Sequence, residues 1–179
     1  MLTNQFFTRV QLAKILNFKS NGMLQNLEKK GFVLPQIKPS KYTFNQVLFM
    51  IICKELTDFT DLSWKDFIDA NFNNVLKENL IDHKLLFLHQ YKNTNQPRIY
   101  LTKDDATARD LNDYLDGDLL NRVSRLEGRE NTTYENIPSF HIYSGKDYNL
   151  LTFSIDRINR KLHNKCTELK IDLREKILA

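Results

Sequence analysis

The feature that most constrains the fold is a pair of short amphipathic segments near the N-terminus, each bounded by residues that start or stop helices. Thr8 is a good N-cap, and apolar residues then recur at helical spacing, which predicts a short helix over residues 9–16. Ser20 is a second candidate N-cap, and a second apolar repeat ends at Gly31. The sequence therefore predicts two short helices about a turn apart.

A proline-bent segment and a strand follow these helices. Residues 32–34 are expected to be extended, Pro35 and Pro39 bend the chain, and Lys41–Phe44 is typical of a returning strand, so that the whole forms a small wing. The alternative is that Pro35–Pro39 is an unstructured connector, because proline-rich turns join many kinds of elements.

Two further helices complete the N-terminal part. Asn45 is the expected N-cap of a buried helix that runs through Leu56, and Ser63 is the expected cap of a fourth helix. The domain is expected to close between Phe72 and Leu80.

This order of elements resembles the DNA-binding domain of MerR-type regulators. The resemblance covers residues 6–70 and rests on three runs, residues 7–16, 23–35 and 41–47. It implies a winged helix-turn-helix whose second helix is the recognition helix. Family members carry an arginine beside the leucine of that helix and another in the wing, where this chain has Gln25 and two lysines. The metal-sensing cysteines of well-known members have no counterpart, so the effector chemistry of the family is not carried over.

The side chains of the proposed helix-turn-helix suit DNA. Amides on the second helix can pair with adenine edges, and lysines with guanine edges or phosphates, while cations of the first helix and the wing can reach the flanking backbone. Gly22 would allow close approach to this helix. The candidate DNA-binding residues are Arg9, Lys14, Lys19, Ser20, Asn21, Gln25, Asn26, Lys29, Lys38, Ser40 and Lys41. The alternative for each is an ordinary solvated surface position.

The charge is unevenly distributed along the chain. Residues 1–56 contain eight basic and two acidic residues, a net charge of +6, whereas residues 57–150 carry 11 basic and 16 acidic residues, a net charge of −5. This asymmetry favours a polyanionic partner for the N-terminal part, or else a solvated basic surface without one.

The C-terminal part is predicted to be a small α+β module with a long C-terminal helix. A hairpin of strands 84–91 and 98–102 is joined by the polar turn 92–97. The other expected elements are an acidic helix from residue 103 to Gly117, a helix over 119–126, a loop over 128–138, a strand over 140–143 and a helix over 154–178.

The last helix carries an apolar stripe at steps of three and four residues. Its members are Ile158, Leu162, Cys166, Leu169, Leu173 and Ile177. Such a stripe packs within its own subunit or forms the seam of a homodimer, and DNA-binding proteins of this size commonly pair to contact two half-sites.

Residue patterns for other functions are weak. The longest apolar run, residues 47–53, is far shorter than the roughly 20 residues that span a bilayer, and no signal peptide is evident, so a cytoplasmic protein without a membrane partner is expected. Cys53 and Cys166 form neither a disulfide framework nor a thiolate metal site. The four histidines, His83, His89, His141 and His163, lack metal-site spacing.

The sequence therefore predicts no enzyme, no catalytic residue, no metal and no cofactor. Glycine occurs only five times and forms no phosphate-binding loop. The acidic run between Asp104 and Asp118 is typical of a helix with a negatively charged N-terminus, with a nuclease-like carboxylate pair as the alternative.

Together these observations predict an α+β protein with a winged helix-turn-helix over residues 1–72, a linker near 73–82, and a module over 83–179 for dimerisation or effector binding. The expected function is sequence-specific binding of double-stranded DNA, as a transcriptional regulator or a plasmid or phage DNA-handling factor. The competing interpretations are an adaptor whose winged domain does not bind DNA and whose acidic middle region docks a partner, and, more weakly, a small enzyme or nuclease in the C-terminal module.

Overall fold

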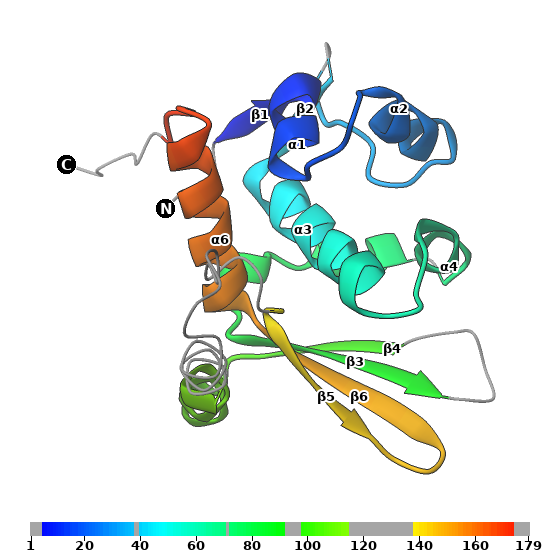
Figure 1. Ribbon diagram of the computed structural model, residues 1–179, viewed down its shortest axis with the longest axis vertical. Coiled ribbons are helices and arrows are strands. Elements are labelled where there is room, and N and C mark those ends of the chain that lie inside the picture. The colour runs from blue at the N-terminus through cyan, green and yellow to red at the C-terminus, as the bar shows by residue number, and fades with distance from the viewer. Residues whose placement is uncertain (1–4, 38–39, 71, 92–97, 115–137, 174–179) are drawn as a thin grey trace, which may run out of the picture. The chain divides into compact units, whose positions relative to one another are not determined.

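The chain is an α+β protein with two compact units. The computed structural model describes residues 5–37, 40–70, 72–91, 98–114 and 138–173. The first unit contains residues 1–80 and 159–179, and the second contains residues 81–158. The terminal helix α6 (Ile155–Glu168) begins in the second unit and continues in the first (Figure 1).

Two short strands and two short helices open the first unit. Strand β1 (Phe6–Thr8) leads directly into helix α1 (Arg9–Ile15). As predicted, Thr8 caps α1: its hydroxyl accepts a hydrogen bond from the Gln11 N–H at 3.2 Å, and the Gln11 side chain accepts one from the Thr8 N–H at 2.8 Å. This reciprocal pair is a capping box, which satisfies two otherwise unpaired donors at the helix start.

Helix α2 (Gly22–Lys29) ends as its sequence predicts, but its expected cap was one residue early. Asn21, not Ser20, is the N-cap, and the Ser20 hydroxyl accepts a hydrogen bond from the Gly22 N–H at 3.3 Å. At the other end Gly31 has a φ of 76°, and the N–H groups of Gly31 and Phe32 donate to carbonyls of the last turn. Glycine adopts this left-handed conformation without steric cost, which explains the stop at Gly31.

The segment between α2 and the next helix differs from its prediction. Residues 32–34 form no strand, and Val33 turns the chain with a φ of 50°. Strand β2 (Lys41–Thr43) pairs antiparallel with β1 instead, with Phe7 opposite Tyr42. Residues 38–39 of the expected wing lie outside the described residues, and on either side of them the Lys41 N–H donates to the Ile37 carbonyl at 2.8 Å.

Helix α3 (Phe44–Phe59) is the centre of the first unit. The cap expected for this helix, Asn45, was wrong. Thr43, not Asn45, caps the helix, because its hydroxyl accepts from the Gln46 N–H at 3.2 Å and the Gln46 side chain accepts from the Thr43 N–H at 2.9 Å. The Asn45 side chain instead bonds the Glu78 carbonyl and the Leu80 N–H. The helix is buried on nearly all sides, including Val47, Leu48, Phe49, Met50, Ile51, Ile52, Cys53 and Leu56.

The expected linker is part of the first unit's core. After helix α4 (Trp64–Asp69), which starts at Ser63 as predicted, the chain forms two short 3-10 helices, η1 (Phe72–Lys77) and η2 (Leu80–Asp82). Phe72 stacks on Phe67 with ring centroids 5.0 Å apart, and Val75 and Leu80 are buried. Apolar burial, which composition alone did not reveal, holds this stretch in place.

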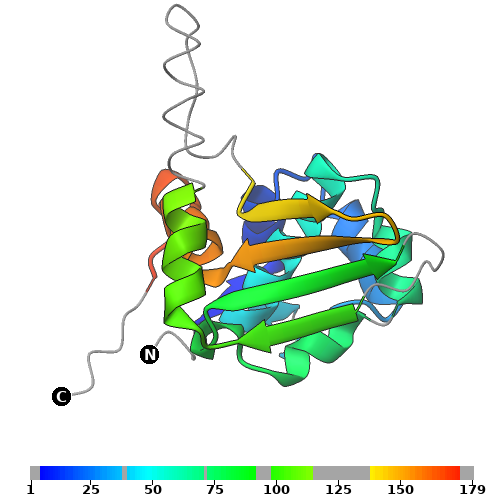
Figure 2. The same cartoon turned by 90° about the horizontal axis from the view of Figure 1, so that it is seen from below.

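The second unit is built on a four-stranded antiparallel sheet in the order β4-β3-β6-β5 (Figure 2). Its strands are β3 (Leu85–Tyr91), β4 (Arg98–Thr102), β5 (Phe140–Ser144) and β6 (Tyr148–Ser154). The predicted hairpin and the strand near residue 140 are confirmed, whereas β6 was missed. A helix over residues 105–114 packs Ala108 and Leu111 against Leu85. The expected turn 92–97, helix 119–126 and most of the loop 128–138 lie outside the described residues.

The terminal helix is shorter than predicted. It ends at Glu168, where Lys170 turns the chain with a φ of 55° and the Ile171 N–H donates to the Cys166 carbonyl, so an end at Leu178 was wrong. Ile158, Leu162 and Cys166 of its apolar stripe are buried within one chain. Ile177 lies outside the described residues. Among the helices that are described, none is both long and apolar enough to cross a membrane.

Candidate nucleic-acid interface

Helix α2 presents a polar stripe to solvent. Leu24 and Leu27 are buried, so the opposite side of the helix faces outward. Four residues at steps of three, one and three positions lie on one stripe of this helix: Gly22, Gln25, Asn26 and Lys29. We call these four residues the α2 face. The side chains of Gln25, Asn26 and Lys29 are all exposed or partly exposed, as a DNA-reading helix requires.

Cations dominate the surface around this helix. Residues 1–50 contain one arginine, six lysines and a single acid, Glu28. Within the described residues, five lysines of this segment are exposed and make no ion pair: Lys14, Lys19, Lys29, Lys30 and Lys41. The sixth, Lys38, lies outside the described part. This segment therefore offers a set of lysines whose charge no carboxylate among the described residues offsets.

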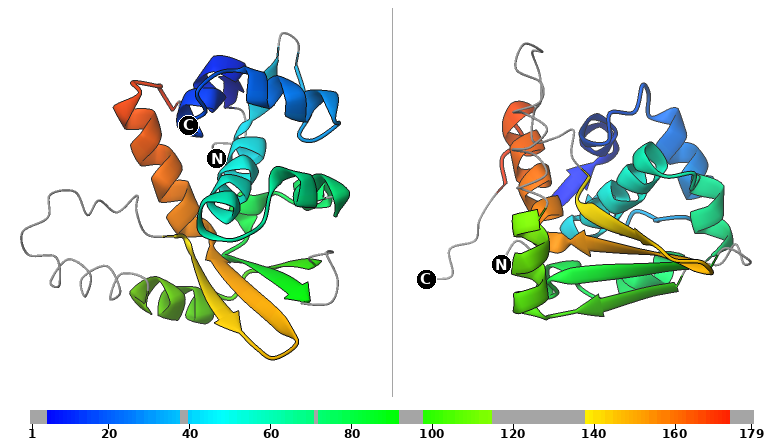
Figure 3. Two further views of the ribbon diagram at one scale, coloured as in Figure 1. Left: turned by 45° about the vertical axis from the view of Figure 1, so that its right-hand side comes forward. Right: turned by 60° about the horizontal axis from the view of Figure 1, so that its bottom comes forward.

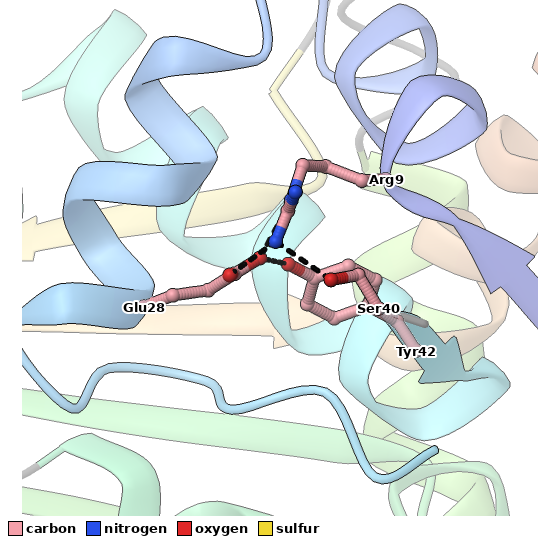
Figure 4. A network of polar contacts seen from close by, with 4 residues as sticks. All are labelled: Arg9, Glu28, Ser40 and Tyr42. Carbon is pink, nitrogen blue, oxygen red and sulfur yellow. Dashed lines mark hydrogen bonds and ion pairs between the residues drawn. The ribbon is translucent and has the colours of Figure 1, made fainter. Parts of the chain in front are cut away.

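The single acid of this segment is held by a polar network (Figure 4). The Arg9 guanidinium donates from Nε to Glu28 Oε1 at 3.0 Å and from Nη2 to Glu28 Oε2 at 2.6 Å, a two-pronged ion pair. Arg9 Nη2 also donates to the Ser40 hydroxyl at 2.6 Å, and the Tyr42 hydroxyl donates to Glu28. The network joins α1, α2 and β2, and it sets the direction in which the α2 face points.

Arg9 and Ser40, both candidates for DNA contact, also have partners within the chain. Arg9 donates to Glu28 and Ser40, and Tyr42 donates to Glu28. Contact of Arg9 and Ser40 with DNA stays a prediction. Lys14, Lys19 and Ser20 are exposed and Asn21 is half-buried, so these four stay candidates. Lys30 was missed, although its position beside Lys29 was a visible signal.

Burial and hydrogen bonding act in opposite directions on Glu28. Burial by itself would raise the pKa of this carboxyl, but the hydrogen bonds from Arg9 and Tyr42 outweigh it and hold the pKa below the ordinary value of 4.5. Burial and the neighbouring Glu28 raise the pKa of Tyr42, so its hydroxyl stays protonated and serves as a donor. The network is therefore intact at neutral pH.

This shift predicts a contribution to stability that acid removes. Because the pKa of Glu28 is lower in the folded than in the unfolded chain, its stabilisation is present above about pH 4.5 and is lost as the pH falls through the folded value. Glu28→Gln is expected to lower the free energy of unfolding at pH 7 by about 1 kcal/mol, since the side chains are partly exposed. Glu28→Gln is also expected to make the free energy of unfolding decrease less steeply as the pH falls below about 4.5.

Urea unfolding between pH 3 and pH 7, followed by Trp64 fluorescence, measures both effects. Asp66→Asn is the matched control, because the hydrogen bond from Ser63 lowers the pKa of Asp66 in the same direction at the start of α4. The free energy of unfolding would then be compared as a function of pH. If Glu28→Gln leaves its pH dependence unchanged while Asp66→Asn alters it, the network does not stabilise the first unit as proposed.

Other kinds of chemistry find little support in the described residues. Burial raises the pKa of both thiols, that of Cys166 to about 11, so neither is a ready nucleophile. Asp104 caps the helix over residues 105–114 by accepting from the Ala106 N–H at 3.1 Å, which agrees with a charged helix start. Asp116 and Asp118 lie outside the described part. Within that part, no group of three or more histidines, cysteines and acids is placed to hold a metal.

Comparison with known proteins adds no relative. No protein-family model and no curated protein matches this chain. A function for the chain is accordingly inferred from the residues and geometry described above.

Proposed function

We propose that the first unit binds double-stranded DNA, with α2 in the major groove. The observation that carries this proposal is the exposed α2 face, which includes Lys29, together with four further exposed lysines of the same segment, Lys14, Lys19, Lys30 and Lys41, that make no ion pair with the described residues. The resemblance of residues 6–70 to MerR-type regulators supports the same role for α2. Two conditions of the proposal are met, since Gln25 and Asn26 lie at the surface and the sole carboxylate of the segment is held by Arg9.

Each part of the interface has a distinct task in this proposal. The amides of Gln25 and Asn26 pair with base edges, for which adenine offers the matching donor and acceptor. The lysines contact phosphates and supply most of the affinity, which is independent of sequence. Gly22 has no side chain, so the backbone of α2 can approach the duplex closely at this position. Lys38 and Lys41 would act as the cations of the wing.

The wider role follows from this binding step. A transcriptional regulator and a plasmid or phage DNA-handling factor share the same need for a helix that reads bases in a duplex. Pairing of two copies through the C-terminal segment would present two α2 helices to two half-sites, and this homodimer belongs to the proposal. Because Ile158, Leu162 and Cys166 are buried within the chain, the described stripe residues left for such a seam are Leu169 and Leu173, which follow the end of α6 at Glu168.

The decisive experiment is the salt dependence of binding to a mixed-sequence duplex. If five lysines meet phosphates, the logarithm of the binding constant should fall with the logarithm of salt concentration with a slope of about −4.5. Fluorescence anisotropy with a labelled duplex at several salt concentrations measures it. Absence of duplex binding at low salt would reject the proposal and favour the adaptor.

A further inference from the structure

A row of aromatic rings crosses one face of the sheet of the second unit. Tyr100 of β4 contacts His89 of β3 at 6.5 Å between ring centroids, His89 contacts Tyr148 of β6 at 4.8 Å, and Tyr148 contacts Tyr143 of β5 at 6.5 Å. Each strand thus contributes one ring. We call these four residues the ring row. The four strands that carry it are seen from two directions in Figure 3.

Strand register places the four rings on the same face. His89 pairs with Leu150, and Leu150 pairs with Tyr143, so these three side chains project to one side of the sheet. Tyr148 lies two residues before Leu150, and Tyr100 pairs with Phe87, two residues before His89. Since side chains alternate along a strand, both join the same face.

Tyr100 and Tyr143 of the ring row are exposed and His89 and Tyr148 are partly buried. On the opposite face five residues are almost fully buried, Leu86, Leu88, Phe140, Leu151 and Phe153, whereas Ile142 is 41% exposed. On the ring-bearing face, the helix over residues 105–114 packs at Leu85 and Phe87, near one end of β3. Tyr100 remains 52% exposed and Tyr143 57% exposed. The exposed rings of these two tyrosines offer flat surfaces on which a partner's rings can stack.

The strands that carry the ring row contribute a cation and no acid. The four strands contain no aspartate or glutamate. Arg98 is exposed and pairs with His89, which puts it on the ring-bearing face at the β4 edge. Lys146 and Asp147 are both exposed in the turn between β5 and β6. The exposed carboxylates of this face lie on the helix over residues 105–114, which packs at Leu85 and Phe87.

We propose that the ring row is a stacking surface for single-stranded nucleic acid. Bases would stack on the tyrosine rings, which accept any base because every base has a π-face, and phosphates would meet Arg98 and Lys146. Duplex DNA does not fit this surface, because its bases are already stacked on one another. The site belongs to the second unit and is independent of the duplex interface proposed for the first.

The test uses the full-length chain with Lys19→Glu, Lys29→Glu and Lys41→Glu, so that the cations of the first unit contribute little. Fluorescence anisotropy is measured with labelled oligothymidylate and oligouridylate of about 16 nucleotides. Replacing both Tyr100 and Tyr143 by alanine is expected to weaken binding at least about tenfold. Replacement of both by phenylalanine, which keeps the rings, should restore it.

Ile142→Ala is the matched control, because Ile142 is exposed on the same strand as Tyr143 but on its opposite face. If the alanine pair fails to fold by circular dichroism, Arg98→Glu carries the same test with every ring kept, and the same tenfold weakening is expected. Binding of either oligonucleotide supports the proposal, and a preference for oligouridylate would add contacts to the 2′-hydroxyl.

Two results would overturn the proposal: no binding of either oligonucleotide, or equal affinity of the folded alanine pair and the parent. A protein partner would then be the better occupant of this face. Because duplex binding by the otherwise unaltered chain should not depend on Tyr100 or Tyr143, failure here is distinguishable from failure of the proposed duplex interface.

Discussion

Replacing Glu55 by alanine is expected to lower the free energy of unfolding of the first unit by about 3 kcal/mol. Lys161 Nζ of α6 lies 2.7 Å from Glu55 Oε1 of α3, and the two side chains are only 12% and 7% exposed. Removal of the Glu55 carboxylate takes this close counter-charge away from a desolvated ammonium, which is far more costly than removal of an exposed pair. The pair also ties the terminal helix to the central helix of the same unit.

Urea unfolding followed by the fluorescence of Trp64, the single tryptophan, measures this effect. Trp64 lies among Phe18, Phe32 and Phe67 with ring centroids about 6 Å away, so it reports on the packing of the first unit. Lys54→Ala is the matched control, because it removes an exposed ion pair with Asp58 from the same helix and should cost less than about 1 kcal/mol.

A double replacement separates charge from packing. Glu55→Leu with Lys161→Met removes both charges and keeps apolar volume, so it should recover most of the stability that Glu55→Ala removes. An equal loss of free energy of unfolding in Glu55→Ala and Lys54→Ala would show that the buried ion pair stabilises the unit no more than an exposed one.

The second large effect concerns DNA affinity. Reversing the charge of Lys19, Lys29 and Lys41 to glutamate is expected to weaken duplex binding about 100-fold or more at 0.1 M salt, which corresponds to about 2.7 kcal/mol. The salt slope should decrease in magnitude by about 3, one for each lysine–phosphate pair that the substitutions remove. All three side chains are exposed and make no ion pair with the described residues, so the fold should be unaffected.

A control with the same change in net charge tests whether position matters. Lys65, Lys77 and Lys103 are exposed lysines outside the proposed interface, and their replacement by glutamate alters the charge equally. Weakening of duplex binding by a similar factor in both triple variants would show that total charge, rather than the assigned surface, governs binding. Intact affinity in the first variant would show that the surface is misplaced.

Local signals predicted the short helices well. The caps at Thr8 and Ser63 and the stop at Gly31 depend on residues within three or four positions, so their effect can be recognised in the sequence. The cap expected at Ser20 was one residue early, since Asn21 is the N-cap of α2. The predicted cap at Asn45 was wrong because distant residues decide where its side chain bonds. Asn45 is as good a cap by residue type as Thr43, but its side chain accepts a hydrogen bond from the N–H of Leu80, 35 residues away.

Strands that depend on distant partners were harder to predict. Strand β1 has three residues and exists because residues 41–43 return beside it. Strand β6 lies between β3 and β5 in the middle of the sheet, and its neighbours stabilise a segment that has no clear alternation of its own. Sheet pairing between residues far apart in the chain is not encoded in any short window.

The sequence by itself determined the amphipathic helices, the helix ends and the excess of lysine near the N-terminus, because these depend on residue type and short spacing. Only the tertiary structure decided which cations are available to a partner: it brought Glu28 and Tyr42 to Arg9 and Glu55 to Lys161, while it left Lys19, Lys29 and Lys41 exposed. Whether a charge is offset depends on groups within a few ångströms of it, and chain folding over long separations sets those neighbours.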